Sequence, residues 1–256
     1  MKIAIIGAGN IGGAIALGLM QSKFAGSFEI TVSDMDAAKT NALIAKYPKL
    51  NATTDNQMAV TGADLVILAV KPWLVETVLK VLDFEGVGML ASVAAGIKFD
   101  QFCGYVSKPV AMFRVIPNTA IRKRASMSLI ASRGATKEQE ELMLDIFNEL
   151  GMAMLVQESQ METGTALASC GIAYVLKYIY AATEAGVEMG LYPHDAMMMV
   201  AQSVKGAAEL LLDGDTHPAL EIDKVTTPGG LTIKGINTLD HEGFSSAVIK
   251  AMKASK

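Results

Sequence analysis

Short apolar runs and amphipathic stretches alternate along the first 157 residues of the chain. The apolar runs are rich in β-branched residues and bounded by turn residues, which is typical of strands buried on both faces of a sheet. These predicted strands are residues 2–6, 28–33, 65–70, 89–94, 110–115, 125–132 and 152–157. Helical patterns lie between them at residues 14–21, 36–47, 73–82 and 136–150, with a short helix from Gln57. This alternation predicts an α/β fold with a doubly wound sheet.

After Glu158 the pattern changes, because no further strand appears and the rest of the chain is helical and apolar. We therefore predict two domains, residues 1–158 and 159–256, without a flexible linker. Residues 165–187 and 195–212 form the longest helical patterns, and Met197, Met198 and Met199 lie in the second. These methionines either fill the core of the small domain or contact a neighbouring subunit. Helices that are apolar on more than one face must be covered, and a second subunit is the expected cover.

The first predicted strand runs directly into a Gly-x-Gly-x-x-Gly motif made of Gly7, Gly9 and Gly12. Gly7 permits a sharp turn, Gly9 permits a pyrophosphate to approach the main chain, and Gly12 permits close packing of the helix on the strand. Asn10 and Ile11 complete the turn, whose free N–H groups and helix dipole favour phosphate. The motif predicts a dinucleotide site, although an ordinary strand and helix with a glycine turn would also fit.

The second predicted strand ends on Asp34, 22 residues after Gly12, where a carboxylate can accept hydrogen bonds from a ribose diol. A carboxylate there repels a 2′-phosphate, so we expect NAD(P)H as cofactor with a weak preference for NADH. Lys39 is the nearest cation that could offset this preference.

Other candidate cofactor-binding residues follow the later strands. In an open α/β sheet the ligand lies at the carboxyl ends of the strands. The candidates found there are Val70, Lys71 and Pro72 after one strand and Asn118 after a later one. Ala95 and Gly96 end the strand between them at the same edge.

Composition excludes several classes of protein. The chain has 256 residues, of which 51% are hydrophobic and 19% charged, with a net charge of −4, so we expect no nucleic-acid partner. It shows no signal peptide and no uninterrupted apolar run of ~18 residues, so we expect a cytoplasmic protein without a membrane span. The two cysteines and three histidines show no ligand spacing, which predicts no metal site. These residues are Cys103, Cys170, His194, His217 and His241.

The last motif is Thr226-Thr-Pro-Gly-Gly-Leu-Thr232, which precedes a helical pattern at residues 233–239. A proline and two glycines at a helix start leave main-chain N–H groups pointing in one direction, which predicts a carboxylate site. A plain helix start capped by threonine is the alternative.

Together these residues resemble pyrroline-5-carboxylate reductases over nearly the whole chain. The segments that carry the resemblance are Gly7 to Gly12, Ala69-Val-Lys-Pro72, Ala95-Gly96, Arg114-Val-Ile-Pro-Asn-Thr119, Thr165-Ala-Leu with Gly171 and Ala173-Tyr174, and Thr227-Pro-Gly-Gly-Leu-Thr232. The resemblance implies a Rossmann domain followed by an all-helical dimerisation domain, in homodimers that can assemble further. It also implies reduction of 1-pyrroline-5-carboxylate to L-proline by NAD(P)H, the last step of proline biosynthesis. The chain departs from the family pattern at Cys170, where a small hydroxyl residue is usual, and at Ile172 and Ala120, where proline is usual.

The expected chemistry requires orientation more than a strong acid. A cyclic imine is basic enough to be protonated by solvent, so the enzyme mainly positions two reactants. The amides of Gly229, Gly230 and Leu231 are expected to bind the substrate carboxylate, with Cys170 nearby, and the Thr232 hydroxyl to bind the ring nitrogen as the catalytic group.

Two alternatives remain open. One is a related imine or keto-acid reductase of the same two-domain plan, in which a lysine such as Lys177 or Lys205 serves as the acid. The other is a dinucleotide-binding regulator without catalytic activity, which the altered segment from Ala168 to Ile172 makes worth testing.

Overall fold

The computed structural model describes residues 1–106 and 108–256. By its internal contacts the chain divides into two compact units, Met1–Ser169 and Cys170–Lys256. The first unit contains all the strands of the described chain, and the second is helical, as the change of pattern near residue 158 predicted.

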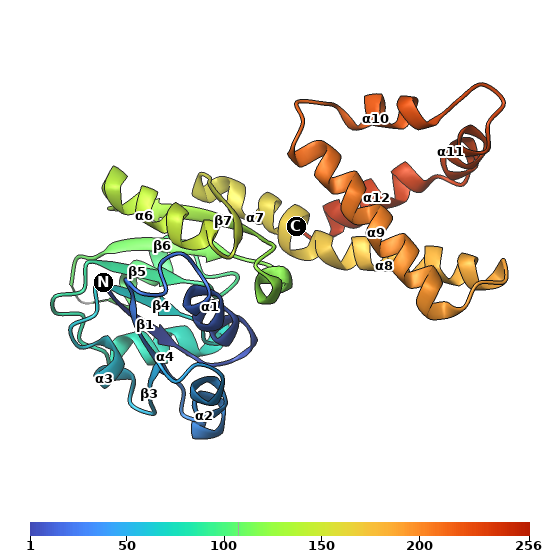
Figure 1. Ribbon diagram of the computed structural model, residues 1–256. Helices are drawn as coiled ribbons and strands as arrows, with labels where there is room; N and C mark the ends of the chain where they lie inside the picture. Colours follow the sequence, from blue (N-terminus) through green and yellow to red (C-terminus); the bar gives the residue numbers. More distant parts are fainter. Residues whose placement is uncertain (107) are drawn as a thin grey trace. The chain divides into compact units, whose positions relative to one another are not determined.

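An eight-stranded sheet forms the first unit, in the order β3-β2-β1-β4-β5-β6-β7-β8 (Figure 1). Neighbouring strands are parallel except for β6 and β7, which are antiparallel. The strands are β1 Lys2–Ile6, β2 Glu29–Ser33, β3 Asn51–Thr53, β4 Leu65–Leu68, β5 Met89–Ser92, β6 Ala111–Ile116, β7 Ser126–Arg133 and β8 Gly151–Leu155. All seven predicted strands are confirmed.

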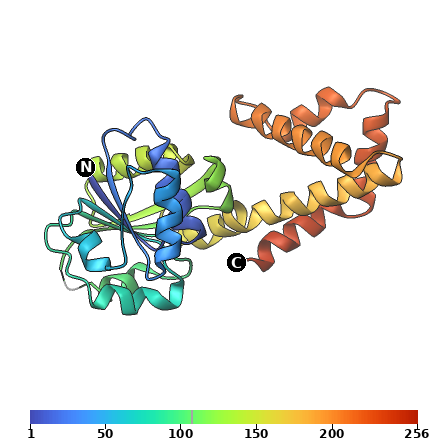
Figure 2. The ribbon, with the colours of Figure 1, turned by 60° about the horizontal axis from the view of Figure 1, so that its bottom comes forward.

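Helices cover both faces of this sheet (Figure 2). They are α1 Asn10–Met20, α2 Ala37–Lys46, α3 Asn56–Val60, η1 Pro72–Leu74, α4 Val75–Lys80, α5 Phe99–Gly104, η2 Thr119–Lys123, α6 Lys137–Asn148, η3 Glu158–Gln160, α7 Met161–Gly164 and the π-helix η4 Thr165–Cys170. Alternate side chains of β1 enter opposite cores: Ile3 and Ile5 pack with α1 and α6, whereas Ala4 and Ile6 pack with α4. Two apolar layers around one sheet confirm the doubly wound fold.

The pattern missed several short elements of the first unit, among them β3 and α5. Strand β3 has three residues, Asn51 to Thr53, and lies at the sheet edge, so it needs no apolar run. Helix α5 presents one turn and a half, whose Phe99 and Phe102 are buried. An element this short is stabilised by its contacts rather than by a periodic pattern.

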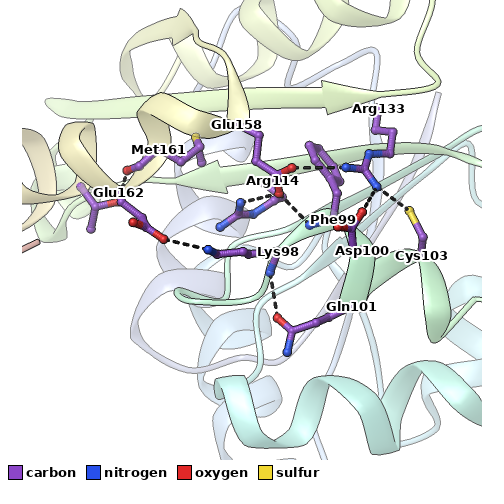
Figure 3. Close-up of polar contacts among 11 residues, drawn as sticks. Lys98, Phe99, Asp100, Gln101, Cys103, Arg114, Arg133, Glu158, Met161 and Glu162 are labelled. Atoms are coloured by element: carbon purple, nitrogen blue, oxygen red, sulfur yellow. Dashed lines mark hydrogen bonds and ion pairs between the residues drawn. The ribbon is translucent and has the colours of Figure 1, made fainter.

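The carboxylate of Glu158, directly after the last strand segment, binds three elements of the first unit (Figure 3). One oxygen accepts from Arg114 Nη1 at 2.7 Å and from the Phe99 N–H at 2.7 Å, and the other accepts from Arg133 Nη2 at 3.3 Å. The Arg114 side chain is 7% exposed in this pair, so the Glu158 carboxylate compensates a largely buried positive charge. Three residues later Met161 is buried in the same unit. These contacts explain why the compact unit continues to Ser169, beyond the boundary predicted at residue 158.

The second unit contains five helices: α8 Gly171–Glu188, α9 Pro193–Leu212, α10 Pro218–Val225, α11 Leu231–His241 and α12 Phe244–Ala254. Helices α8 and α9 approach closely, since a Cβ on Gly186 would lie 2.9 Å from the Cβ of Ala196. The Tyr174 hydroxyl on α8 contacts Ser255 Oγ after α12. Within residues 170–256 only three residues are buried, namely Gly171, Gly186 and Ala196. A single copy of this unit therefore has almost no core.

One helix of the described chain, Glu158–Glu188, is long and apolar enough to cross a membrane by length and composition, with a hydropathy of 1.3 over its most apolar window. We expected no span because no uninterrupted apolar run in the sequence is long enough, whereas an average over a window tolerates single polar residues. Only 11% of that window is buried in one copy of the chain, so most of its apolar surface must be covered by something outside that copy.

Candidate dinucleotide and substrate sites

The glycine turn after β1 has the geometry that its spacing predicted. Gly7 has φ +107°, and a Cβ there would lie 2.6 Å from the Ala69 carbonyl oxygen. A Cβ on Gly12 would lie 1.9 Å from the Gly7 carbonyl oxygen, so only glycine lets α1 pack this closely. A Cβ on Gly9 would meet nothing within 4 Å, which leaves the main chain accessible to a ligand. Gly7 thus serves the turn, Gly12 the packing of the helix, and Gly9 the approach of a ligand to the main chain.

Helix α1 starts at the mouth of a pocket of ≈ 550 Å³ at the carboxyl edge of the sheet. Its N-cap residue, Gly9, has no side chain to satisfy the first amides of the helix, so these remain available to an anion. The pocket brings together eight of the predicted cofactor-binding residues: Gly7, Gly9, Asn10, Ile11, Asp34, Val70, Lys71 and Pro72. Their shared location supports a nucleotide site.

Asp34 lies in the wall of this pocket with its carboxylate held by the backbone. The Ala8 N–H donates to Oδ2 at 2.8 Å, and the Asp36 N–H donates to Oδ1 at 2.9 Å. Lys39 Nζ also lies 3.4 Å from Oδ1. Burial acts to raise the pKa of Asp34, but the amides of Asp36 and Ala8 and the Lys39 ammonium outweigh it and hold the pKa below its usual value. The pocket therefore contains a fixed negative charge at neutral pH.

Two predicted cofactor-binding residues do not line the pocket. Gly12 is buried beneath it, where it contributes packing rather than a surface. Asn118 is also buried, and both ends of its amide bind other parts of the protein: Oδ1 accepts from the Ala120 N–H at 2.9 Å, and Nδ2 donates to the Ala168 carbonyl at 3.0 Å.

Asn56 also lines the pocket, although its surrounding sequence gave no sign of this. Its Oδ1 accepts from Ser33 Oγ at 2.6 Å, which links the start of α3 to the end of β2. Asn56 reaches the pocket because β3 precedes it, and that strand gave no apolar signal. The sequence indicated that a helix starts after Thr53-Thr-Asp-Asn56, but not that this helix start lies beside the pocket.

The Thr226 to Thr232 motif forms a turn followed by α11, as predicted. Gly229 has φ +71°, and the Gly230 N–H donates to the Thr227 carbonyl at 3.0 Å. The Gly230 amide, one of the three expected to bind a carboxylate, is therefore engaged within the turn. Gly230 is the N-cap of α11 and provides no side-chain cap, so the first amides of the helix remain open.

The remaining candidate substrate groups lie in the second unit. Thr232 is exposed in the first turn of α11, and Cys170 is partly exposed as the N-cap residue of α8. Among the described residues, no group of three or more His, Cys, Asp or Glu side chains could hold a metal ion.

Comparisons with known proteins agree with this geometry in both halves of the chain. Residues 158–256 match the family described as "Pyrroline-5-carboxylate reductase dimerisation", and residues 2–96 match "NADP oxidoreductase coenzyme F420-dependent". The first of these covers the helical region that follows the sheet.

Two relatives and one solved structure illustrate the similarity. Pyrroline-5-carboxylate reductase 1 of Dictyostelium discoideum is 37% identical over 99% of this chain, which spans about half of that longer protein (48%). Pyrroline-5-carboxylate reductase of Methanosarcina acetivorans is 34% identical, with 100% of this chain and 97% of the relative covered. The structure of the Coxiella burnetii pyrroline-5-carboxylate reductase is similar with a TM-score of 0.91 at 28% identity, covering 99% of this chain and 95% of that one.

The motifs that suggested a resemblance thus lie in the regions that these comparisons match. A dinucleotide pocket precedes a dimerisation domain in one chain, and relatives of full length align from end to end. The chain belongs to the pyrroline-5-carboxylate reductase family.

Proposed function

We propose that this chain reduces 1-pyrroline-5-carboxylate to L-proline with NAD(P)H, the last step of proline biosynthesis. The observation that carries the proposal is the presence, in one chain, of two uncapped helix starts that follow glycine turns. Helix α1 begins at a pocket with the features of a dinucleotide site, and α11 begins within the domain matched to the family. One suits a pyrophosphate, and the other suits a carboxylate.

In this proposal the substrate carboxylate binds the open amides at the start of α11, those of Leu231 and Thr232, with Gly230 shaping the turn. The Thr232 hydroxyl then donates to or accepts from the ring nitrogen on the same side. Solvent protonates the imine, and NAD(P)H, when bound, supplies a hydride to the ring carbon of the C=N bond. The nitrogen keeps its proton and becomes a secondary amine. The residues of the protein act by orienting the substrate and by stabilising the change of charge at the ring nitrogen during hydride transfer.

A keto-acid or other imine reductase with a lysine acid is less well supported. Lys177 Nζ lies 5.0 Å from the centre of the Tyr180 ring on the exposed surface of α8, and Lys205 pairs with Glu209 at 3.5 Å on α9. Both lysines already have exposed partners. A catalytic lysine needs a desolvated position that lowers its pKa.

The direct test mixes the protein with pyrroline-5-carboxylate and NADH or NADPH and follows loss of nicotinamide absorbance. Turnover to proline is the expected result. Reduction of other cyclic imines or keto acids without activity on pyrroline-5-carboxylate would favour the related-reductase alternative. Binding of the dinucleotide without any turnover would favour the regulator.

We further propose a preference for NADH within the NAD(P)H class, because the Asp34 carboxylate is ionised and held by two backbone amides. Lys39 already pairs with this carboxylate, so a 2′-phosphate would compete for it. The expected kcat/KM is higher with NADH, and Asp34→Ser is expected to shift the ratio toward NADPH. Equal or better kcat/KM with NADPH in the unchanged protein would show that Lys39 overrides the carboxylate.

The assembly that fits these sites is a cytoplasmic homodimer, or a higher homo-oligomer built on dimers, without a nucleic-acid or membrane partner. The exposed apolar surface of α8 and α9 supports it, because the matched family domain is one of dimerisation. Light scattering in detergent-free buffer tests this proposal, and a monomer with full activity would exclude it.

A further inference from the structure

A π-helical segment, Thr165–Cys170, interrupts the helix that joins Met161 to Glu188. Such widened turns are rare and are frequently found at functional sites. This segment ends on Cys170, the residue expected near the substrate.

Asn118 binds this segment from the loop that follows β6. Its Nδ2 donates to the Ala168 carbonyl at 3.0 Å, while its Oδ1 accepts from the Ala120 N–H at 2.9 Å and thereby caps η2. A flipped amide would place an oxygen against the Ala168 carbonyl and an NH₂ group against the Ala120 N–H, so the two contacts fix its orientation. The neighbouring Ser169 hydroxyl adds a longer contact to the Pro117 carbonyl, at 3.4 Å.

The loop that carries Asn118 lies at the edge of the sheet where the dinucleotide pocket opens. Strands β5 and β6 are parallel, with Ser92 opposite Arg114, so residues 93–95 after β5 and residues 117–118 after β6 leave the sheet in the same direction. Val93, Ala94 and Ala95 line the pocket. Asn118 follows at that edge, but its own side chain is turned toward Ala168 and is buried.

We propose that Asn118 is a positioning residue, which holds the π-helical segment on the cofactor edge of the sheet through the Ala168 carbonyl, rather than binding the dinucleotide. This inference rests on the proposed function for its kinetic test. Its structural part, the anchoring of the segment, can be measured without any turnover.

Asn118→Asp separates the two contacts of the amide. The carboxylate keeps an oxygen for the Ala120 N–H, since aspartate is a good N-cap, but replaces the donor to Ala168 with an oxygen that repels the carbonyl. Asn118→Ser also keeps a capping oxygen, adds no charge and is too short to reach Ala168. The matched control is Asn148→Asp on α6, an exposed residue whose Oδ1 accepts from the Ala153 N–H at 2.8 Å and keeps that acceptor.

Three quantities are measured for each variant: amide hydrogen exchange of peptides covering residues 161–172, the Kd of NADH, and kcat and KM for pyrroline-5-carboxylate. We expect both Asn118 variants to exchange faster in these peptides and to keep the Kd of NADH within about twofold. We expect kcat/KM for the substrate to fall by about 10- to 100-fold, because a small misplacement of a reacting group has effects of that order. Asn148→Asp is expected to match the unchanged protein in all three.

Unchanged hydrogen exchange in both Asn118 variants would overturn the inference, whatever their activity. A rise in the Kd of NADH with unchanged kcat at saturating NADH would also overturn it and assign Asn118 to the cofactor. If the unchanged protein lacks turnover with pyrroline-5-carboxylate, the proposed function fails, and the exchange result still decides whether Asn118 anchors the segment.

Discussion

The two units of the chain differ sharply in how they bury apolar residues. In the first unit, β4, β5 and β6 are buried along their whole length, and side chains such as Phe113 and Phe147 are fully enclosed. In the second unit the buried residues are Gly171, Gly186 and Ala196, and large apolar side chains such as Leu176 and Leu212 are more than half exposed. The first unit therefore closes its core within one copy, whereas the second requires another copy to cover it.

The same contrast separates the two proposed anion sites. The glycine turn before α1 is packed against β4, since a side chain on Gly7 or Gly12 would collide with the main chain or with Ala69. The turn before α11 is packed on itself rather than on other elements: a Cβ on Gly229 would meet nothing within 4 Å, and the nearest atoms to a Cβ on Gly230 belong to Thr227 of the same turn. A rigid nucleotide site and an open carboxylate site imply that assembly completes the second but not the first.

The largest expected effect comes from a charge on the exposed apolar surface of α8. Leu176→Asp should shift the protein to monomers and lower kcat/KM by about 100-fold or more, because an unpaired charge in a buried interface costs about 3–5 kcal/mol. Val81→Asp is the matched control, since Val81 is a 77% exposed aliphatic residue of the first unit. Sedimentation velocity and turnover measure the outcome. If Leu176→Asp and Val81→Asp have the same dimer fraction, the apolar surface of α8 is not the subunit interface.

The next effect concerns Thr232, which is exposed at the start of α11. Thr232→Ala keeps the backbone amides, so NADH binding should be unchanged while turnover falls by roughly 5- to 150-fold, the equivalent of one hydrogen bond of about 1–3 kcal/mol. Thr232→Ser restores the hydroxyl and should recover most of the rate. Steady-state kinetics at saturating NADH, and separately at saturating NADPH, measures the change in turnover. A loss of less than about twofold would make Thr232 a helix-entry residue only.

The smallest expected effects distinguish the roles of Gly9 and Gly12, two glycines of the same motif, in cofactor binding and in stability. Gly9→Ala adds a methyl group in open space, so the Tm should hold while the Kd of NADH rises on the order of tenfold, or about 1.4 kcal/mol. Gly12→Ala would place a Cβ 1.9 Å from the Gly7 oxygen and should lower the Tm, since overpacking costs about 1–3 kcal/mol. Thermal unfolding and nicotinamide fluorescence measure the two. Equal stability of both variants would show that α1 moves away from β1 more easily than its packing indicates.

Much of the first unit could be predicted because its signals are local. The apolar run in residues 2–6 is typical of a strand inside a parallel sheet, and Gly7 follows it with the positive φ that a tight turn needs. Asp34 was identified by its position after the second strand, and the structure adds the two amides that hold its carboxylate. The lining residue Asn56, which the sequence did not indicate, and the contact of the Asn118 amide with Ala168 both depend on residues far away in the sequence.

The sequence by itself determined the alternation of strands and helices, the glycine turn, and the change to an apolar helical region after Glu158, because each depends on residues within one or two turns of chain. Tertiary structure alone decided three other features: the antiparallel pairing of β6 with β7, the Glu158 carboxylate that binds Arg114 and Arg133, and the turn of the Asn118 amide away from the pocket toward Ala168. These features join residues separated by up to 50 positions, and a hydrogen bond or ion pair is specified only once the backbone has brought its two groups within about 3 Å.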